Sequence, residues 1–333
     1  MKIGIIGLGM MGRTHYEAYQ NIDGAQVVAV ADRNPKRASG DLSGTGGNVL
    51  KGGLQQLPMD RIKGTTNASE LIASDVDIVD VCVPTVEHVQ VAIEAIKAGK
   101  HVLCEKPLAR TLADAEKIAA AAREAKGFFM PAMCMRFWPQ WAWLKQAIVE
   151  KRYGKVLAAS FRRAASMPAG WYKNGAMSGG AALDLHIHDT DFVQHLFGMP
   201  KAVSSRGYTK TSGEIDHLAT HYIYDDIPLV AAEGTWSLAD GYGFTMQYTV
   251  NFENATADYD LAREQPLRVS QGGQTESIDA GPGFGYAAEL RYFIDCATKG
   301  QKPTVVTGDD AVRSIRLVEA EVKSVRSGEV VRL

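Results

Sequence analysis

The chain has 333 residues, which is long enough for two domains, each with its own core. Hydrophobic residues make up 46% of it and charged residues 22%, which are ordinary values for a soluble globular protein. The formal net charge of −2 gives no electrostatic reason to expect nucleic acid or an anionic membrane as a partner.

Several features predict a cytoplasmic protein. The first twelve residues, MKIGIIGLGMMG, place glycines where a signal peptide would need an apolar segment, and no apolar run approaches the length of a membrane span. The cysteines are far apart and form no C-x-x-C pair, so we expect free thiols in a reducing compartment. They are Cys82, Cys104, Cys134 and Cys296.

Strands and helices alternate in the first part of the chain. The apolar, β-branched runs that predict strands are residues 2–6, 26–32, 76–84, 100–107 and 127–135. Segments 85–99 and 111–126 have helical periodicity, with Gly99 as a C-cap and Thr111 as an N-cap. Because the strands are apolar throughout, we predict a doubly wound α/β domain with a parallel sheet covered on both faces. The Gly- and Ser-rich residues 39–53 predict a long loop.

The pattern changes after residue 125. A Trp-rich helix is predicted over 139–154, followed by runs of strand character and two helices near the end, 286–300 and 308–328. The strand-like runs cover residues 155–166, 201–210, 217–226, 227–238 and 244–254. We therefore predict a dinucleotide-binding domain over 1–125 and an α+β domain over 126–333, whose C-terminal helix can pack back on the first domain.

A glycine motif follows the first predicted strand and opens a helix. It is a G-x-G-x-x-G formed by Gly7, Gly9, Met10, Met11 and Gly12. Such glycines permit a tight turn, close approach of a pyrophosphate and close packing of helix on sheet. Asp32 lies twenty residues beyond Gly12, where an acid accepts hydrogen bonds from an adenosine ribose, and Arg33 can stack on adenine or accommodate a 2′-phosphate. The motif predicts NAD as the preferred cofactor, with NADP possible; the structural alternative is a glycine-rich turn that binds nothing.

With these motifs in place, the chain resembles the Gfo/Idh/MocA family of glucose–fructose oxidoreductase-like and inositol dehydrogenase-like enzymes. The resemblance is carried, in the expected order, by VCVPTVEH, GKHVLCEKP and GGAALDLHIHDTD, and it covers essentially the whole chain. It implies a Rossmann domain followed by an α+β domain with a large, mostly antiparallel sheet. One face of that sheet often makes oligomer contacts, so a homodimer or homotetramer is expected.

The resemblance also implies site residues. Catalysis would fall to Lys106 of the E-K-P motif and to Asp184 and His188, and cofactor contacts to Pro84, His88, Glu105 and Lys106. Substrate contacts would come from Lys106, Asp184, His188, Arg136, Arg163, Trp171, Tyr172 and Tyr286. The family often has glycine where this chain has His186, which is expected to add a polar group near the pocket.

The stretch LDLHIHDTDF, residues 183–192, has three possible interpretations. On one helix Asp184, His188 and Asp191 share a face, which suits acid–base chemistry. Metal ligation by His186 and His188 would need further ligands that the sequence does not supply, so no metal is predicted. A solvated polar face is the third interpretation. His15, His101, His195, His217 and His221 join no constellation and are predicted to be structural or exposed.

The predicted reaction is hydride transfer between nicotinamide and a secondary alcohol or ketone carbon of a sugar, inositol or related polyol. His188 or Lys106 would move the proton, and Asp184 would orient the imidazole or bind a neighbouring hydroxyl. Two alternatives have other functions: a cofactor-binding regulator or inactive homologue, and an NAD-dependent enzyme of the same fold that cleaves a glycosidic bond. The sequence does not distinguish among sugars or carbons.

Overall fold

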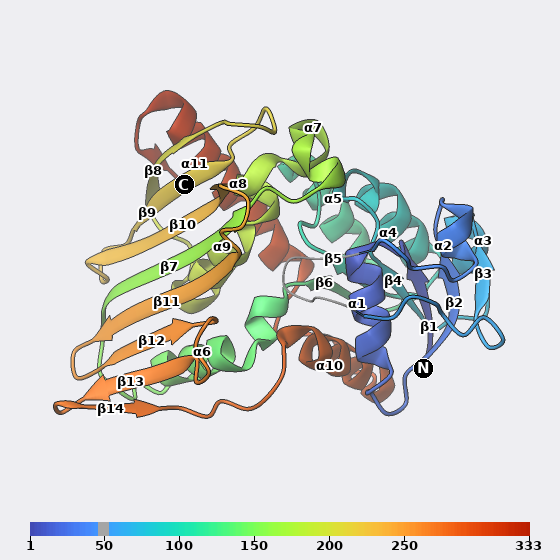
Figure 1. The fold of residues 1–333 in the computed structure, drawn as a ribbon, viewed down its shortest axis with the longest axis horizontal. Coiled ribbons are helices and arrows are strands. Elements are labelled where there is room, and N and C mark those ends of the chain that lie inside the picture. Colours follow the sequence, from blue (N-terminus) through green and yellow to red (C-terminus); the bar gives the residue numbers. More distant parts are fainter. Residues whose placement is uncertain (46–52) are drawn as a thin grey trace. The chain divides into compact units, whose positions relative to one another are not determined.

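The computed structural model describes residues 1–45 and 53–333, and it divides the chain into two compact units (Figure 1). Unit 1 comprises Met1–Phe137 and Phe284–Val312, and unit 2 comprises Trp138–Gly283 and Arg313–Leu333. Of the predicted loop over 39–53, residues 46–52 lie outside the described ranges.

Unit 1 contains a six-stranded parallel sheet in the order β3-β2-β1-β4-β5-β6. Its strands are β1 (Lys2–Ile6), β2 (Gln26–Ala31), β3 (Lys63–Thr65), β4 (Ile78–Val81), β5 (His101–Glu105) and β6 (Phe129–Ala132). This is the strand order of a doubly wound dinucleotide-binding fold, in which ligands bind beyond the carboxyl ends of the strands, where the order reverses between β1 and β4. The predicted fold of this region is confirmed.

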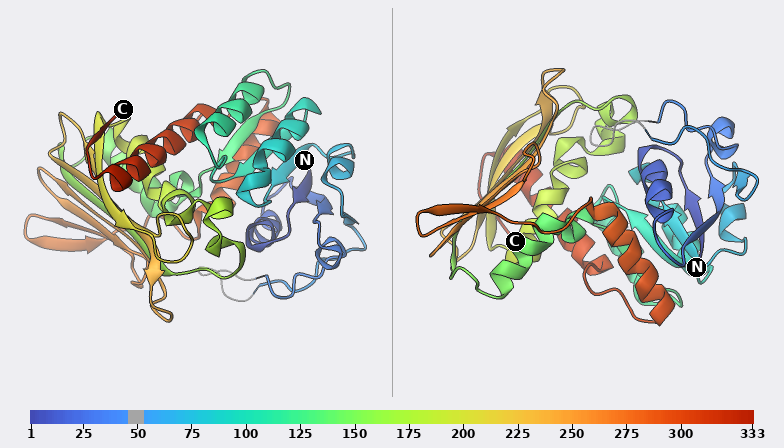
Figure 2. Two further views of the ribbon diagram at one scale, coloured as in Figure 1. Left: turned by 90° about the horizontal axis from the view of Figure 1, so that it is seen from above. Right: turned by 60° about the horizontal axis from the view of Figure 1, so that its bottom comes forward.

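Helices lie on both faces of this sheet (Figure 2). They are α1 (Met10–Tyr19), α2 (Pro35–Ala38), α3 (Ala68–Ile72), α4 (His88–Lys97), α5 (Leu112–Arg123) and α10 (Gly285–Lys299), with short 3₁₀ turns η1 (Thr85–Glu87) and η2 (Cys134–Phe137). The predicted caps are present: the Thr111 side chain accepts a hydrogen bond from the Asp114 N–H, and Gly99 has a φ of 77° at the end of α4.

Two features of unit 1 differ from the predicted division at residue 125. Strand β6 pairs with β5, and therefore the unit continues to Phe137. The chain also returns to unit 1 at Phe284, where α10 packs against α1 and η2. The helix α11 (Gly308–Ser327) begins in unit 1 and continues in unit 2, with the division after Val312.

Unit 2 contains a nine-stranded sheet in the order β14-β13-β12-β11-β7-β10-β9-β8-β15, in which only the β7–β10 pairing is parallel among the described strand pairs. The strands are β7 (Val156–Ser166), β8 (Ala202–Tyr208), β9 (His217–Ile223), β10 (Leu229–Leu238), β11 (Phe244–Phe252), β12 (Thr256–Asp260), β13 (Leu267–Gln271), β14 (Gln274–Ser277) and β15 (Val331–Arg332). This confirms the predicted large, mostly antiparallel sheet.

Helices of unit 2 cover one face of this sheet (Figure 2). They are α6 (Pro139–Val149), α7 (Gly175–Ser178), α8 (Gly180–Asp184), α9 (Ile187–Phe197) and the part of α11 after Val312, with the 3₁₀ turn η3 (Gly170–Lys173). Trp141 of α6 is fully buried at the centre of this layer, with its ring against Phe161, Phe192 and Tyr248 at centroid distances of 5.8, 4.8 and 5.4 Å. These aromatic contacts fix α6 and α9 on the sheet.

Candidate functional site

The glycine loop lies between the carboxyl end of β1 and the start of α1. Gly7 has a φ of 95°, and a Cβ there would lie 2.5 Å from the Cys82 carbonyl oxygen. A Cβ on Gly12 would lie 1.9 Å from the Gly7 oxygen, whereas one on Gly9 would meet nothing within 4 Å. The first and third glycines therefore serve packing, and the second keeps open the space that a pyrophosphate needs. Met10 and Met11 follow as the half-buried first residues of α1.

Asp32 connects the end of β2 to this loop. Its Oδ2 accepts a hydrogen bond of 2.8 Å from the Leu8 N–H, and its Oδ1 accepts one of 2.8 Å from the Asn34 N–H. Arg33 next to it is 76% exposed at its side chain and lies 2.6 Å from Glu87 Oε1 through Nη2. The carboxylate is thus held beside the glycine loop, as the predicted ribose contact requires.

Lys106 follows β5 at the same edge of the sheet, and its side chain is half-buried. Its backbone N–H donates a hydrogen bond of 3.0 Å to Oε2 of Glu105. Pro84 follows β4, the neighbouring strand, and is also half-buried. Gly7, Asp32 and Lys106 each come directly after a parallel strand, and Pro84 lies three residues beyond β4. One edge of the sheet therefore carries these predicted cofactor residues and the predicted catalytic lysine.

His88 has a different role from the predicted one. Its side chain is buried, with Nδ1 at 2.9 Å from the Pro107 carbonyl oxygen and Nε2 at 2.9 Å from the Val83 carbonyl oxygen. Burial lowers the pKa of His88, so the ring is neutral and donates to one of the two. Both polar atoms face protein carbonyls, and His88 therefore joins the loop after β4 to the loop after β5 instead of contacting the nicotinamide.

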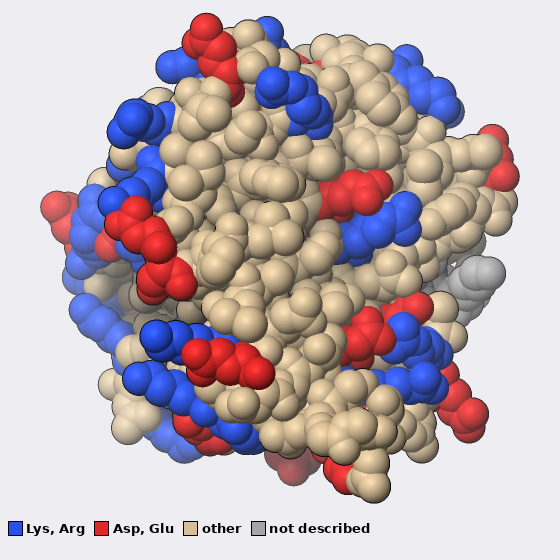
Figure 3. All heavy atoms as spheres, turned by 90° about the vertical axis from the view of Figure 1, so that its left-hand side faces the viewer, with Lys and Arg blue, Asp and Glu red and all other residues tan. Residues whose placement is uncertain are grey.

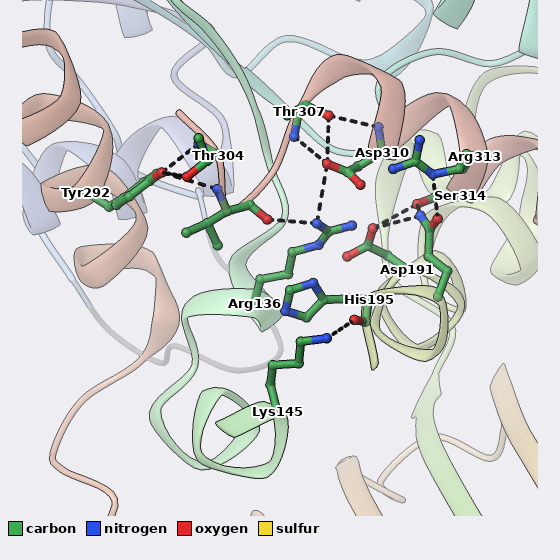
Figure 4. A network of polar contacts seen from close by, with 12 residues as sticks. Arg136, Lys145, Asp191, His195, Tyr292, Thr304, Thr307, Asp310, Arg313 and Ser314 are labelled. Atoms are coloured by element: carbon green, nitrogen blue, oxygen red, sulfur yellow. Dashed lines mark hydrogen bonds and ion pairs between the residues drawn. The ribbon is translucent and has the colours of Figure 1, made fainter. Parts of the chain in front are cut away.

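Arg136 also differs from its prediction as a substrate contact. Its side chain is 3% exposed, and Nη1 donates to the Val305 carbonyl oxygen at 2.8 Å and lies 3.6 Å from Asp310 Oδ2 (Figure 4). Asp310 also accepts hydrogen bonds from the N–H and hydroxyl of Thr307. Arg136 therefore fixes the returning segment within unit 1. Tyr286 lies in the first turn of α10 and is half-buried, and its substrate contact stays a prediction.

In unit 2 the predicted single helix through the Asp–His motif is interrupted. Asp184 is the last residue of α8, and His188 lies in the first turn of α9. The break has a clear cause in the backbone, where the His186 N–H donates to the Ala181 oxygen, five residues back, at 2.8 Å. This wide turn changes the direction of the chain before α9 begins.

Asp191, expected on the same face as His188, is engaged elsewhere in unit 2. It is buried, and its Oδ1 accepts hydrogen bonds from the Ser314 hydroxyl at 2.8 Å and from Gln194 Nε2 at 3.3 Å (Figure 4). Asp191 thus ties α9 to α11.

His186 is buried against the sheet, which corrects the expectation of an added polar group near the pocket. The ring lies beside Gly234 of β10, where a Cβ would come within 2.5 Å of His186 Nδ1, so a glycine on the strand makes room for the histidine on the helix. Burial and the nearby Arg163 lower the pKa of His186 to about 3, so the ring is neutral. Its Nε2 lies 3.6 Å from Glu321 Oε2, a contact that is therefore not an ion pair.

Glu321 of α11 is the acid next to the buried His186 ring. Its carboxylate oxygens lie 3.1 and 3.3 Å from the Thr190 hydroxyl, and burial raises the pKa of Glu321 to about 8. At neutral pH the folded protein therefore keeps this carboxyl protonated, whereas the unfolded chain ionises it above about pH 4.5.

Glu321→Gln is expected to stabilise the protein at alkaline pH. Because the pKa of Glu321 is higher in the folded than in the unfolded protein, ionisation of Glu321 favours the unfolded chain. The free energy of unfolding of wild type therefore falls between about pH 4.5 and about pH 8, by roughly 1.4 kcal/mol per pH unit. Gln cannot ionise and keeps an acceptor for Thr190, so the variant should match wild type near pH 5 and exceed it by a few kcal/mol at pH 8.5. Urea unfolding at the two pH values measures this, with the exposed Glu319→Gln on the same helix as control. An equal difference at both pH values would contradict it.

Arg163, predicted to contact substrate, is a core residue of unit 2. Nε and Nη2 donate to the two carboxylate oxygens of Asp189 at 2.8 and 3.2 Å, and the guanidinium lies 5.5 Å from the centre of the Trp141 ring. Both side chains of the pair are almost fully buried. The guanidinium neutralises a buried acid, which accounts for its position.

Trp171 and Tyr172 form a stacked pair in η3, with ring centroids 4.2 Å apart and planes at 25°. Both are half-buried, and Tyr172 also meets Trp236 edge-on at 6.2 Å. Partly exposed aromatic faces suit the apolar face of a sugar ring, so their substrate contact stays a prediction.

A cluster on unit 1 was missed because His15 is far in sequence from the residues that it contacts. His15, predicted to join no constellation, is fully buried with Nδ1 at 2.9 Å from Asp80 Oδ2 and Nε2 at 3.1 Å from Glu105 Oε1. His15, Asp80 and Cys82 are the single group among residues 1–45 and 53–333 that brings three potential metal-ligand atoms within 4.8 Å of one another. The Nδ1–Oδ2 contact has hydrogen-bond geometry, so the group is accounted for without an ion.

The family follows from both halves of the chain. Residues 1–133 match the Gfo/Idh/MocA oxidoreductase family with its NAD-binding Rossmann fold, and residues 145–333 match the C-terminal alpha/beta domain of the same family. The chain belongs to this family. It is accordingly an oxidoreductase whose N-terminal domain is of the NAD-binding type, which confirms the resemblance, the fold class and the NAD(H) prediction.

Named relatives agree with this assignment. The chain is 28% identical to a myo-inositol 2-dehydrogenase of Thermotoga maritima, over 100% of this chain and 98% of the relative. It is 26% identical to an inositol 2-dehydrogenase of Rhizobium meliloti, over 98% and 97%. A levoglucosan dehydrogenase solved with NADH and levoglucosan has the same fold, with a TM-score of 0.86 and 21% identity over 100% of this chain and 99% of that one.

Proposed function

We propose that the protein transfers hydride between NAD and a secondary alcohol carbon of a cyclic polyol or sugar. The observation that carries the proposal is the common edge of the unit 1 sheet, where the open glycine loop, Asp32 and Lys106 all follow parallel strands. When bound, the nicotinamide supplies the hydride chemistry, so the protein must bind the substrate and move one proton. The inositol and levoglucosan dehydrogenases among its relatives support a polyhydroxylated ring as substrate.

Lys106, Asp184 and His188 carry the proton chemistry in this proposal. Lys106 donates to the reacting oxygen and stabilises its developing negative charge, and His188 or Lys106 takes the proton. Asp184 orients the imidazole or binds a neighbouring hydroxyl. Trp171, Tyr172 and Tyr286 complete the substrate contacts, and all three are half-buried.

NAD is proposed in preference to NADP. The Asp32 carboxylate beside the glycine loop accepts hydrogen bonds from ribose hydroxyls and repels a 2′-phosphate. The exposed Arg33 next to Asp32 forms an ion pair with Glu87, and this ion pair weakens the attraction of Arg33 for a phosphate.

One assay tests the function. Inositols, hexoses, anhydro-sugars and sugar phosphates are incubated with NAD or NADP, and the absorbance of reduced nicotinamide is followed. The proposal expects net NADH from at least one cyclic polyol or sugar. Cleavage of a glycoside without net NADH would indicate the lyase alternative, and tight NADH binding without turnover on any compound would indicate a regulator.

The protein is also proposed to form a homo-oligomer through the sheet face of unit 2 that its helices leave uncovered. The middle strands present small or uncharged residues there, including Ala158, Ser160, Ala219 and Ala231, with Arg162 and Glu233 bonded to each other at 3.0 Å. Figure 3 shows this face, with most charged side chains toward its margins. A flat face of this kind suits a second copy.

Ala231→Arg is expected to reduce the oligomer to a smaller species. Ala231 lies opposite Ser160 on β7 and His221 on β9, so an arginine there would place a charge in the middle of the proposed contact. Light scattering after size exclusion gives the mass, with the exposed Gln301→Arg of unit 1 as control. A wild-type protein that elutes as a monomer would refute the proposal.

No helix in the described ranges is long and apolar enough to cross a membrane. The cytoplasmic location stays a prediction.

A further inference from the structure

The buried cluster around His15 is not explained by the cofactor motif. His15 on α1, Asp80 on β4 and Glu105 at the end of β5 come from three elements of unit 1, and each is at most 6% exposed. An unpaired charge buried away from water is strongly unfavourable. The two carboxylates and the imidazole are therefore stable in the core only as charge partners of one another.

His15 is the cation of this cluster. Burial alone would lower the pKa of His15, but the Asp80 carboxylate at 2.9 Å and the nearby Cys82 together outweigh burial and hold the pKa well above its ordinary value. The Tyr19 hydroxyl donates a second hydrogen bond of 2.9 Å to Asp80 Oδ2, and Cys82 Sγ lies 3.5 Å from His15 Nδ1. The pKa of Tyr19 is raised well above its ordinary value, mainly by burial, and the Glu289 carboxyl of α10 also raises it. The Tyr19 hydroxyl therefore stays neutral and remains a hydrogen-bond donor.

Glu105, which the resemblance assigns to the cofactor, is buried with both carboxylate oxygens facing protein groups, and it connects this imidazolium to the proposed catalytic lysine. Its Oε1 lies 3.1 Å from His15 Nε2, and its Oε2 accepts the Lys106 backbone N–H at 3.0 Å. The contact between His15 Nε2 and Glu105 Oε1 does not have hydrogen-bond geometry, so it is an ion pair only. Electrostatic attraction to the imidazolium therefore holds the Glu105 carboxylate in place. Oε1 of Glu105 is thereby fixed in the core by His15. Oε2 is bonded to the backbone N–H of Lys106 and so restrains the position of that residue.

We propose that His15, paired with Asp80, is a positioning residue that fixes Glu105 and through it the backbone of Lys106 for the hydride-transfer reaction. This rests on the proposed function of Lys106. In this arrangement His15 never contacts substrate, and its removal affects the rate of the chemical step more than the binding of either ligand.

The first experiment is independent of the reaction. Nitrogen NMR of protein with ¹⁵N-labelled histidine rings reports whether the His15 ring carries one proton or two. Wild type is expected to show a doubly protonated ring at pH 8, and Asp80→Asn a neutral one. A neutral His15 ring in wild type would overturn the proposal whatever the enzyme does.

The second experiment measures kcat, KM and NADH affinity on the panel compound that wild type oxidises fastest. Glu105→Gln removes the charge that His15 attracts but keeps an oxygen for the Lys106 N–H, so kcat should fall about 10-fold with KM and NADH affinity nearly unchanged. Glu105→Ala, which loses both contacts, should lower kcat further, and the exposed Asp75→Asn should leave it unchanged.

The outcomes separate this proposal from the function on which it rests. If Lys106→Met abolishes turnover while Glu105→Gln and Glu105→Ala retain normal kcat, the positioning role of the cluster is wrong and the function stands. If Lys106→Met itself retains turnover, the proposed function of Lys106 is wrong, and the positioning role for it falls too. The NMR result then still decides whether His15 is charged. A loss of NADH binding in Glu105→Gln equal to its loss of kcat would also overturn a positioning role, because it would indicate general disruption of unit 1.

Discussion

Lys106→Met lowers turnover by about 10²-fold or more, while NADH still binds with nearly wild-type affinity. The lysine follows β5 at the edge of the sheet that carries the glycine loop, and methionine has a similar length without the ammonium. A donor aimed at the oxygen that becomes negatively charged stabilises the transition state more than the bound substrate, so the loss should appear in kcat.

The measurement is steady-state oxidation of the best panel substrate, with NADH affinity from fluorescence titration. Lys97→Met is the matched control, because Lys97 is an exposed lysine in the last turn of α4. Near-normal turnover in Lys106→Met would refute the assigned role. Equal losses of turnover and NADH affinity would place the lysine in cofactor binding alone.

The parts of the fold that local sequence determines could be predicted. The glycine loop, its adjoining strand and helix, and Asp32 all lie within the first 32 residues, and the contact that excludes a side chain at Gly12 is with Gly7 of the same loop. The caps at Thr111 and Gly99 are equally local. By contrast, β3 has three residues without an apolar pattern, and the edge strand β14 is exposed throughout, so neither was predicted.

The parts that depend on distant partners could not be predicted. His15 acquires its charge from Asp80, 65 residues away, and no spacing rule links the two. Arg163 looked like a polar group for the pocket because its partner Asp189 lies on another element. The same holds for His186, whose burial depends on Gly234 having no side chain. In each case a polar residue could not be assigned to core or pocket until its neighbour was known.

His188→Ala is likewise expected to lower turnover by about 10²-fold or more, with NADH binding retained. His188 is half-buried in the first turn of α9, directly after the wide turn that ends α8 at Asp184. If the imidazole moves the proton, then free imidazole in the buffer should restore part of the activity of His188→Ala and none of that of Lys106→Met. An absence of rescue, together with an unchanged pH profile, would leave the proton with Lys106 and give His188 a substrate-binding role.

The double variant Lys106→Met/His188→Ala tests whether the two residues act on one oxygen. Residues that act as a unit lose little more together than the more damaging single change, whereas independent residues lose the product of the two factors. A combined loss near 10²-fold, not about 10⁴-fold, would indicate that both side chains serve the same chemical step. A loss near the product would indicate that the two residues contribute to turnover independently.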